Sequence, residues 1–149
     1  MSQIKDGIAR IFKTHEVVLV YLFGSQQDAG RAFLEEKPFG AVETSDLDIG
    51  ILFKTPPAHP YRCFGTLYAD LSGFFEPFKI DIVFLHEVHS ILKFEITKGI
   101  RIYAADEEWA DAYEDMVMKF AADLTVKRRM FEPDFIEAVE NGHFEIEHP

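Results

Sequence analysis

Three runs of β-branched, aliphatic and aromatic residues, at 17–23, 46–53 and 79–85, most constrain how this chain can fold. Residues of these kinds favour β-strands. Apolar residues recur instead at the spacing of amphipathic helices near the N-terminus and again within 61–75 and 90–98. Strands that alternate with helices predict an α/β or α+β domain.

The remaining stretches differ in how regular they are. Residues 26–45 are predicted to form a loop with a short helix around 31–37, and Gly99 to end the preceding helix as a left-handed C-cap. A short extended stretch should follow at 100–104. From Glu107 to about residue 131 we expect a long helix whose buried stripe comprises Trp109, Tyr113, Val117 or Met116, and Phe120.

Length and charge narrow the class of protein. The 149 residues fit a single domain, expected at 1–131, followed by a tail at 132–149 that holds six acids and no Lys or Arg. A formal net charge of −11 repels nucleic acid backbones, so no direct nucleic-acid binding is expected. The longest apolar run is far shorter than the ~20 residues of a membrane span, and the N-terminus lacks the layout of a secretion signal. The single cysteine fits a reducing compartment, so we expect a cytoplasmic protein without a membrane partner.

Two carboxylates at the start of the second predicted strand carry the first functional signal. Asp46 and Asp48 are two residues apart, so on a strand they project from one face while Leu47 and Ile49 project from the other. Two like charges this close are unfavourable unless a cation or a donor lies between them. The alternative is an exposed strand start with two solvated acids.

A third carboxylate, Asp81, interrupts the apolar run of the third predicted strand. Such a run suggests a strand covered on both faces, where desolvating an unpaired carboxylate is costly. Either Lys79 or a backbone donor balances the charge, or Asp81 joins Asp46 and Asp48 across neighbouring strands. Three carboxylates without a nearby base suit Mg²⁺, which prefers oxygen ligands.

The turn after the first predicted strand adds a candidate phosphate site. Gly24 has no side chain where a phosphate would approach, and Ser25 offers a hydroxyl and a backbone N–H at a predicted helix start. A Gly-Ser pair alone is a weak signal, and it gains weight here because the paired acids follow it.

Together these motifs resemble those of the DNA polymerase β superfamily. The resemblance rests on Leu22-Phe23-Gly24-Ser25, on Ser45-Asp46-Leu47-Asp48-Ile49, on Asp81 within an apolar strand and on the segment from Ile96 to Tyr103. Within the superfamily the chain is most similar to the minimal nucleotidyltransferases found beside HEPN-domain toxins in prokaryotes. The resemblance covers about residues 17–131 and implies a polymerase β-like nucleotidyltransferase fold, a small mixed sheet flanked by helices.

The resemblance implies a role for each motif residue. Asp46 and Asp48 would hold two Mg²⁺ ions over the triphosphate of ATP. Asp81 would complete the catalytic metal site and help to activate the acceptor hydroxyl. Gly24 and Ser25 would hold the β- and γ-phosphates. The implied reaction transfers AMP to a hydroxyl and releases pyrophosphate; an acceptor known in the family is a tyrosine of the partner HEPN toxin, which the modification silences, so the protein would act as an antitoxin.

The chain departs from the family pattern between these motifs. The family places an Ala-Arg-Gly sequence soon after its Gly-Ser pair and uses a shorter connection to the first acid, whereas here residues 26–45 separate Ser25 from Asp46. Arg31 is therefore the predicted triphosphate contact, with Lys37 as a second candidate. The longer loop implies either a distinctive lid or reduced activity.

Two alternative functions fit the same motifs. A small-molecule nucleotidyltransferase of the aminoglycoside type would use the same acids, although the chain shows no extra helical domain to hold a drug. A catalytically weak antitoxin would neutralise its toxin by binding alone, which the missing arginine and the acidic tail favour. A hetero-complex with the toxin and a homo-oligomer are both compatible with the sequence.

Overall fold

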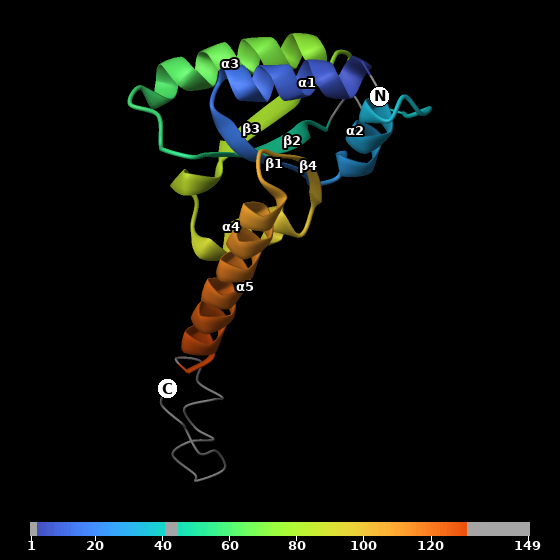
Figure 1. Cartoon of the computed structure of the whole chain (residues 1–149). Coiled ribbons are helices and arrows are strands. Elements are labelled where there is room, and N and C mark those ends of the chain that lie inside the picture. The colour runs from blue at the N-terminus through green and yellow to red at the C-terminus, as the bar shows by residue number, and fades with distance from the viewer. Residues whose placement is uncertain (1–2, 41–44, 131–149) are drawn as a thin grey trace.

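A four-stranded sheet carries helices on both of its faces (Figure 1). The computed structural model describes residues 3–40 and 45–130, and the predicted acidic tail at 132–149 lies outside them. In chain order the elements are α1 (Gln3–Thr14), β1 (Val17–Phe23), α2 (Gln27–Leu34), β2 (Leu47–Phe53), α3 (Pro60–Phe74), β3 (Ile80–Phe84), the 3₁₀ turn η1 (Leu85–Glu87), α4 (Ser90–Thr97), β4 (Ile100–Ala104) and α5 (Glu107–Met130). The predicted mixed sheet flanked by helices is confirmed. No helix in the described ranges is long and apolar enough to span a bilayer.

The strand order β3-β2-β1-β4 decides where the predicted motifs meet. β1 runs antiparallel to both β2 and β4, and β2 runs parallel to β3. The C-terminal end of β1 therefore lies beside the N-terminal ends of the other three strands. The Gly-Ser turn and the three predicted acids all lie at this end of the sheet.

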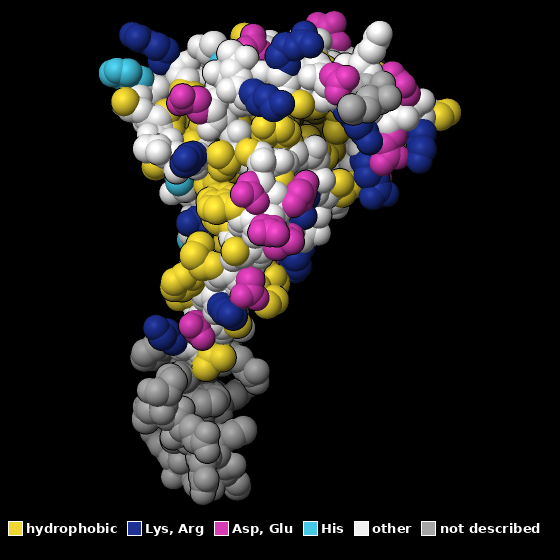
Figure 2. All heavy atoms as spheres, in the orientation of Figure 1, with side chains coloured by type: hydrophobic (Ala, Val, Ile, Leu, Met, Phe, Trp, Pro, Cys, Tyr) yellow, Lys and Arg dark blue, Asp and Glu magenta, His cyan; other side chains and the backbone are white. Residues whose placement is uncertain are grey.

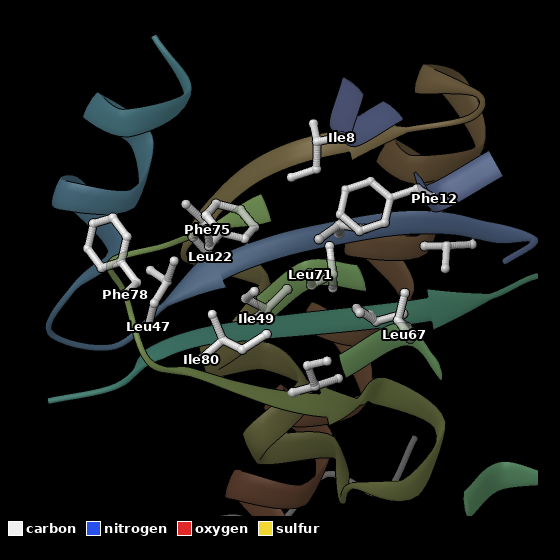
Figure 3. Close-up of a cluster of buried hydrophobic side chains, with 14 of the residues drawn as sticks. Ile8, Phe12, Leu22, Leu47, Ile49, Leu67, Leu71, Phe75, Phe78 and Ile80 are labelled. Carbon is white, nitrogen blue, oxygen red and sulfur yellow. The ribbon is translucent and has the colours of Figure 1, made fainter. Parts of the chain in front are cut away.

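The larger core lies between the sheet and the helices α1 and α3 (Figure 3). Alternate residues of each strand face it, because successive side chains of a strand point to opposite faces. Its members include Ile8 and Phe12 from α1, Leu67 and Leu71 from α3, and Leu22, Leu47, Ile49 and Ile80 from the strands.

The opposite face of the sheet is covered by α4 and the beginning of α5. A second cluster there combines strand residues such as Leu19, Tyr21 and Leu52 with Ile96 of α4 and Ala110 of α5. Burial is the main reason that the pKa of the Tyr21 phenol lies far above its usual value, and the nearby Glu114 carboxylate adds to it. Tyr21 therefore stays neutral in this second core.

Ion pairs of Arg101 join the beginning of α5 to the sheet. The guanidinium of Arg101, on β4, lies 2.8 Å from the carboxylate of Glu107, 2.9 Å from that of Asp111 and 2.7 Å from that of Glu114. Carboxylates three and four residues apart lie on one side of a helix. The first two turns of α5 thus present a single acidic side to one strand residue.

Two local predictions about the connections were wrong. The short helix after the Gly-Ser turn begins at Gln27, earlier than predicted. Gly99 does not have a left-handed conformation; Gly24 is the glycine with positive φ in the described residues. Gly99 is needed for a different reason, because a Cβ at that position would overlap the backbone oxygen of Leu22. A close approach of two strands, and not a helix cap, explains this glycine.

The predicted buried stripe of α5 was also wrong in part. Val117 is buried, but Trp109 is 43% exposed and Phe120 is 54% exposed. Figure 1 shows that α5 extends well beyond the sheet, which leaves Phe120 without a covering surface. Trp109 lies in the first turn of α5, beside the buried side of the helix, and stacks on Tyr113.

Candidate active site

Asp46 and Asp48 stand at the end of the sheet where the strand ends meet. Asp46 precedes β2, and Asp48 is the second residue of that strand. Leu47 and Ile49 alternate with them and are fully buried in the core beneath α1 and α3. Strand alternation therefore turns Asp48 toward the opposite face, where it is half-buried, while Asp46 is exposed.

Asp81 lies directly beside Asp48 on the neighbouring parallel strand, since the two residues are partners in the register of β2 and β3. The apolar run had suggested a strand covered on both faces. β3 is instead an edge strand, and Asp81 is exposed. Within the described residues no ion pair joins Asp81 to Lys79. The sheet register thus brings Asp81 to Asp48, while the base that could have balanced it makes no such pair.

The Asp48 carboxyl is affected by burial and by the other two acids. Partial burial raises the pKa of the Asp48 carboxyl above its usual range, and the negative charges of Asp81 and Asp46 raise it further. Each of these effects disfavours the ionised form of Asp48. A cation placed among the carboxylates would reverse the effect of the two neighbours.

The three carboxylates are chemically suited to binding Mg²⁺. All three side chains offer carboxylate oxygens, the ligands that Mg²⁺ prefers. As the side chains stand, no three His, Cys, Asp or Glu residues of the described part of the chain are close enough to hold a metal ion. Rotation of the exposed Asp46 and Asp81 side chains would be needed for all three to share an ion, and their exposure leaves them free to rotate.

The Gly-Ser turn lies against Asp48. Gly24 has a φ of +76°, a conformation that other residues rarely adopt. A Cβ on Gly24 would in addition overlap the carboxylate of Asp48. The backbone of the turn therefore passes directly over the acid. Ser25 is exposed and lies just before Gln26, the N-cap of α2, so its hydroxyl and backbone are open to solvent near the acids.

Arg31, the predicted triphosphate contact, is an exposed residue of α2. Its side chain helps to line a cavity of about 180 Å³ between α1, α2 and β4, together with Lys5, Leu34, Ile100 and Tyr103. None of the three acids and neither residue of the Gly-Ser turn lines that cavity. The ammonium of Lys37, the second candidate, lies 2.9 Å from the carboxylate of Glu35. Within the described residues neither base forms an ion pair with the three acids, and their contact with a triphosphate stays a prediction.

Sequence reasoning assigned no role to two glycines that hold the site in place. A Cβ on Gly30 of α2 would lie 2.7 Å from Leu47 and 2.9 Å from Leu22, so α2 packs tightly against the strands next to the acids. A Cβ on Gly50 would lie 2.6 Å from Ile96, so α4 packs directly on β2 two residues beyond Asp48. A glycine inside an apolar strand run is the signal that could have predicted the second contact.

In this strand order the Gly-Ser turn lies against paired acids on adjacent strands. This is the arrangement of a nucleotidyltransferase. The chain matches the family "Polymerase beta, Nucleotidyltransferase" over residues 6–108, and it belongs to that family. No curated protein matches the sequence.

Several solved structures share the fold. A chain of a mutant MntA–HpeT toxin–antitoxin complex is 16% identical, with a TM-score of 0.63 over 89% of this chain and 98% of that chain. A toxin–antitoxin structure with AMP-PNP gives 15% identity and a TM-score of 0.61 over 89% of this chain and 98% of that chain. The complex of a tri-AMPylated Shewanella oneidensis HEPN toxin with its MNT antitoxin gives 14% identity and a TM-score of 0.58, over 89% and 96% of the two chains.

Proposed function

We propose that this protein is a Mg²⁺-dependent nucleotidyltransferase that transfers AMP from ATP to a tyrosine hydroxyl of a HEPN-domain toxin, and thereby acts as its antitoxin. The observation that carries the proposal is the position of Asp81 beside Asp48 on adjacent strands, with Gly24 directly over Asp48. Family membership supports the reaction class. A relative of the same fold is in complex with an AMPylated HEPN toxin, which supports the choice of acceptor.

The residues at this end of the sheet suit an in-line displacement at the α-phosphorus. The acceptor oxygen forms a new bond to that phosphorus, and the bond to the bridging oxygen breaks, so that pyrophosphate leaves. Mg²⁺ bound by Asp46, Asp48 and Asp81 would supply charge stabilisation to the entering and leaving oxygens. Asp81 would take the proton of an acceptor hydroxyl that arrives from solvent, and its exposure on the edge strand supports this role.

The turn contributes through its backbone. Because Gly24 carries no side chain, a phosphate can approach the N–H groups of Gly24 and Ser25 closely. The Ser25 hydroxyl is exposed and can donate to a phosphate oxygen. These contacts would hold the β- and γ-phosphates and leave the α-phosphate over the carboxylates.

Transfer of label from α-³²P-ATP to a purified HEPN toxin tests the proposal. Wild-type protein with Mg²⁺ should label the toxin and release an equal amount of pyrophosphate. Asp48→Asn and Asp81→Asn should abolish the labelling, while Asp6→Asn, an exposed acid on α1, should leave it unchanged. Labelling that persists in Asp48→Asn would refute the assignment of the site.

One observation favours a second candidate, an antitoxin that acts by binding alone. Arg31, the candidate replacement for the family's arginine, lines a cavity between α1, α2 and β4 that none of the three acids lines. Under this alternative the protein binds the toxin tightly and blocks its activity with no transfer of label. Equal protection by wild-type protein and by Asp48→Asn would favour it over the enzyme.

A further inference from the structure

One side of α5 exposes large apolar side chains that nothing in the described residues covers completely. Trp109, Met116 and Phe120 are 43%, 46% and 54% exposed, and Leu124 is 37% exposed. With the half-buried Tyr113, which stacks on Trp109, they recur every three or four residues and so share one side of the helix. We call these five residues the α5 stripe.

The α5 stripe is adjacent to the surface by which α5 joins its own domain. Ala110, Val117 and Ala121 are buried, and Ala110 packs into the cluster that contains Ile96 of α4. Figure 2 shows hydrophobic side chains gathered along one side of the part of α5 that extends from the body. A helix of a monomer does not usually expose a continuous row of large apolar residues, and such rows mark interaction surfaces.

Acidic and basic residues are concentrated in opposite halves of α5. Its first half carries only acids (Glu107, Glu108, Asp111, Glu114 and Asp115), and its second half carries Lys119, Lys127, Arg128 and Arg129 with one acid, Asp123. Arg101 and Lys119 pair with several of the acids. Glu108 near one end and Lys127 and Arg128 near the other have no ion-pair partner in the described part of the chain.

We propose that the α5 stripe binds the same stripe of a second copy of this chain, with the two α5 helices antiparallel. In this arrangement Trp109 of one copy lies opposite Leu124 of the other, and Tyr113 lies opposite Phe120. Glu108, which has no ion pair within the described residues, then lies near Lys127 of the second copy. An antiparallel pair has a two-fold axis, so every contact is made twice, and a helix with one acidic and one basic end complements itself.

The oligomeric state of the protein alone tests the apolar part of the proposal. In size-exclusion chromatography with light scattering, without nucleotide or toxin, the full chain should be a dimer at micromolar concentration. Phe120→Glu should raise the dissociation constant of the dimer by at least about tenfold, since large central apolar residues dominate interfaces. The matched control is Met118→Glu: Met118 is 47% exposed on the other side of the same helix, and its substitution should leave the dimer intact.

Charge reversal tests the antiparallel orientation. Glu108→Lys should weaken its own dimer, and so should Lys127→Glu. An equimolar mixture of the two variants should form heterodimers, because each reversed end then meets an opposite charge. Failure of the mixture to associate more strongly than either variant would refute the orientation.

Three results would overturn the proposal. The first is a monomeric wild-type chain, including one that dimerises only after removal of residues 131–149. The second is equal loss of dimer in Phe120→Glu and Met118→Glu. The third is a monomer whose Phe120→Glu variant loses toxin binding, which would assign the stripe to the toxin. None of these measurements depends on ATP or on AMP transfer, so they leave the proposed function to be judged separately.

Discussion

At the scale of single residues, Gly24 is the position where backbone conformation and site geometry coincide. Its φ of +76° disfavours any side chain, and a Cβ would meet the Asp48 carboxylate. The same residue therefore sets the course of the turn and the space above the acid. A substitution there should affect folding and nucleotide binding together.

Gly24→Ala should lower the free energy of unfolding by about 1–2 kcal/mol from the left-handed backbone alone. It should also reduce Mg·ATP binding, because the added Cβ would displace the Asp48 carboxylate from the site. The matched control is Gly65→Ala in α3, where a Cβ meets nothing within 4 Å. That change should stabilise the protein by about 0.5–1 kcal/mol, since glycine is unfavourable within a helix. Urea unfolding of both variants would show opposite signs, and equal signs would contradict this account.

Asp48→Asn should change how stability depends on pH in metal-free protein. The pKa of Asp48 is raised, chiefly by burial, so the folded protein keeps this proton to a higher pH than the unfolded chain does. Stability from this group is therefore lost as pH rises above the unfolded value of about 4. Asn has no proton to lose, so the stability of the variant relative to wild type should increase from acid to neutral pH. Urea unfolding in EDTA at acid and at neutral pH measures this difference in stability, and a constant difference would contradict the raised pKa of Asp48.

At the scale of elements, α5 is held to the sheet through Arg101 and its three carboxylate partners. The guanidinium binds several carboxylates at once because it presents donors in a fixed fork. The connection explains how a helix that extends beyond the sheet keeps a fixed direction at its beginning.

Arg101→Ala should lower the free energy of unfolding by about 1–3 kcal/mol, because three charge-assisted hydrogen bonds are lost and the carboxylates then repel one another. Amide hydrogen exchange should increase at the first turns of α5 more than in the sheet. Arg62→Ala is the control: Arg62 is exposed on α3 and has no ion pair within the described residues. Its stability should stay within about 0.5 kcal/mol of wild type. An equal decrease in the free energy of unfolding of both variants would show that the ion pairs of Arg101 do not stabilise the contact between α5 and the sheet.

At the scale of the whole molecule, binding of Mg·ATP should stabilise the fold. A ligand that binds the folded state alone stabilises it by about 2.7 kcal/mol at one hundred times its dissociation constant. Arg31→Ala and Lys37→Ala, compared by thermal unfolding with and without Mg·ATP, test whether either base replaces the family's arginine. The predicted contact should reduce the Mg·ATP-dependent rise in melting temperature in at least one variant. An unchanged rise in both would show that residues 26–45 supply no such contact.

The sequence alone determined most of the elements and the alternation at the acids. The alternation of Asp46 and Asp48 with Leu47 and Ile49 predicts one polar and one buried side of the strand, because strand periodicity is local. The strand runs and the helix spacing depend on near neighbours in the same way.

The tertiary structure decided what depends on distant segments. The order of the strands brought Asp81 beside Asp48, and it made β3 an edge strand whose acid is exposed. The packing of α2 turned Arg31 toward a cavity with α1 and β4, although its place in the sequence had suggested the triphosphate. The end of the sheet left Phe120 exposed, because a helical pattern shows which residues are apolar on one side but not how far the partner surface extends.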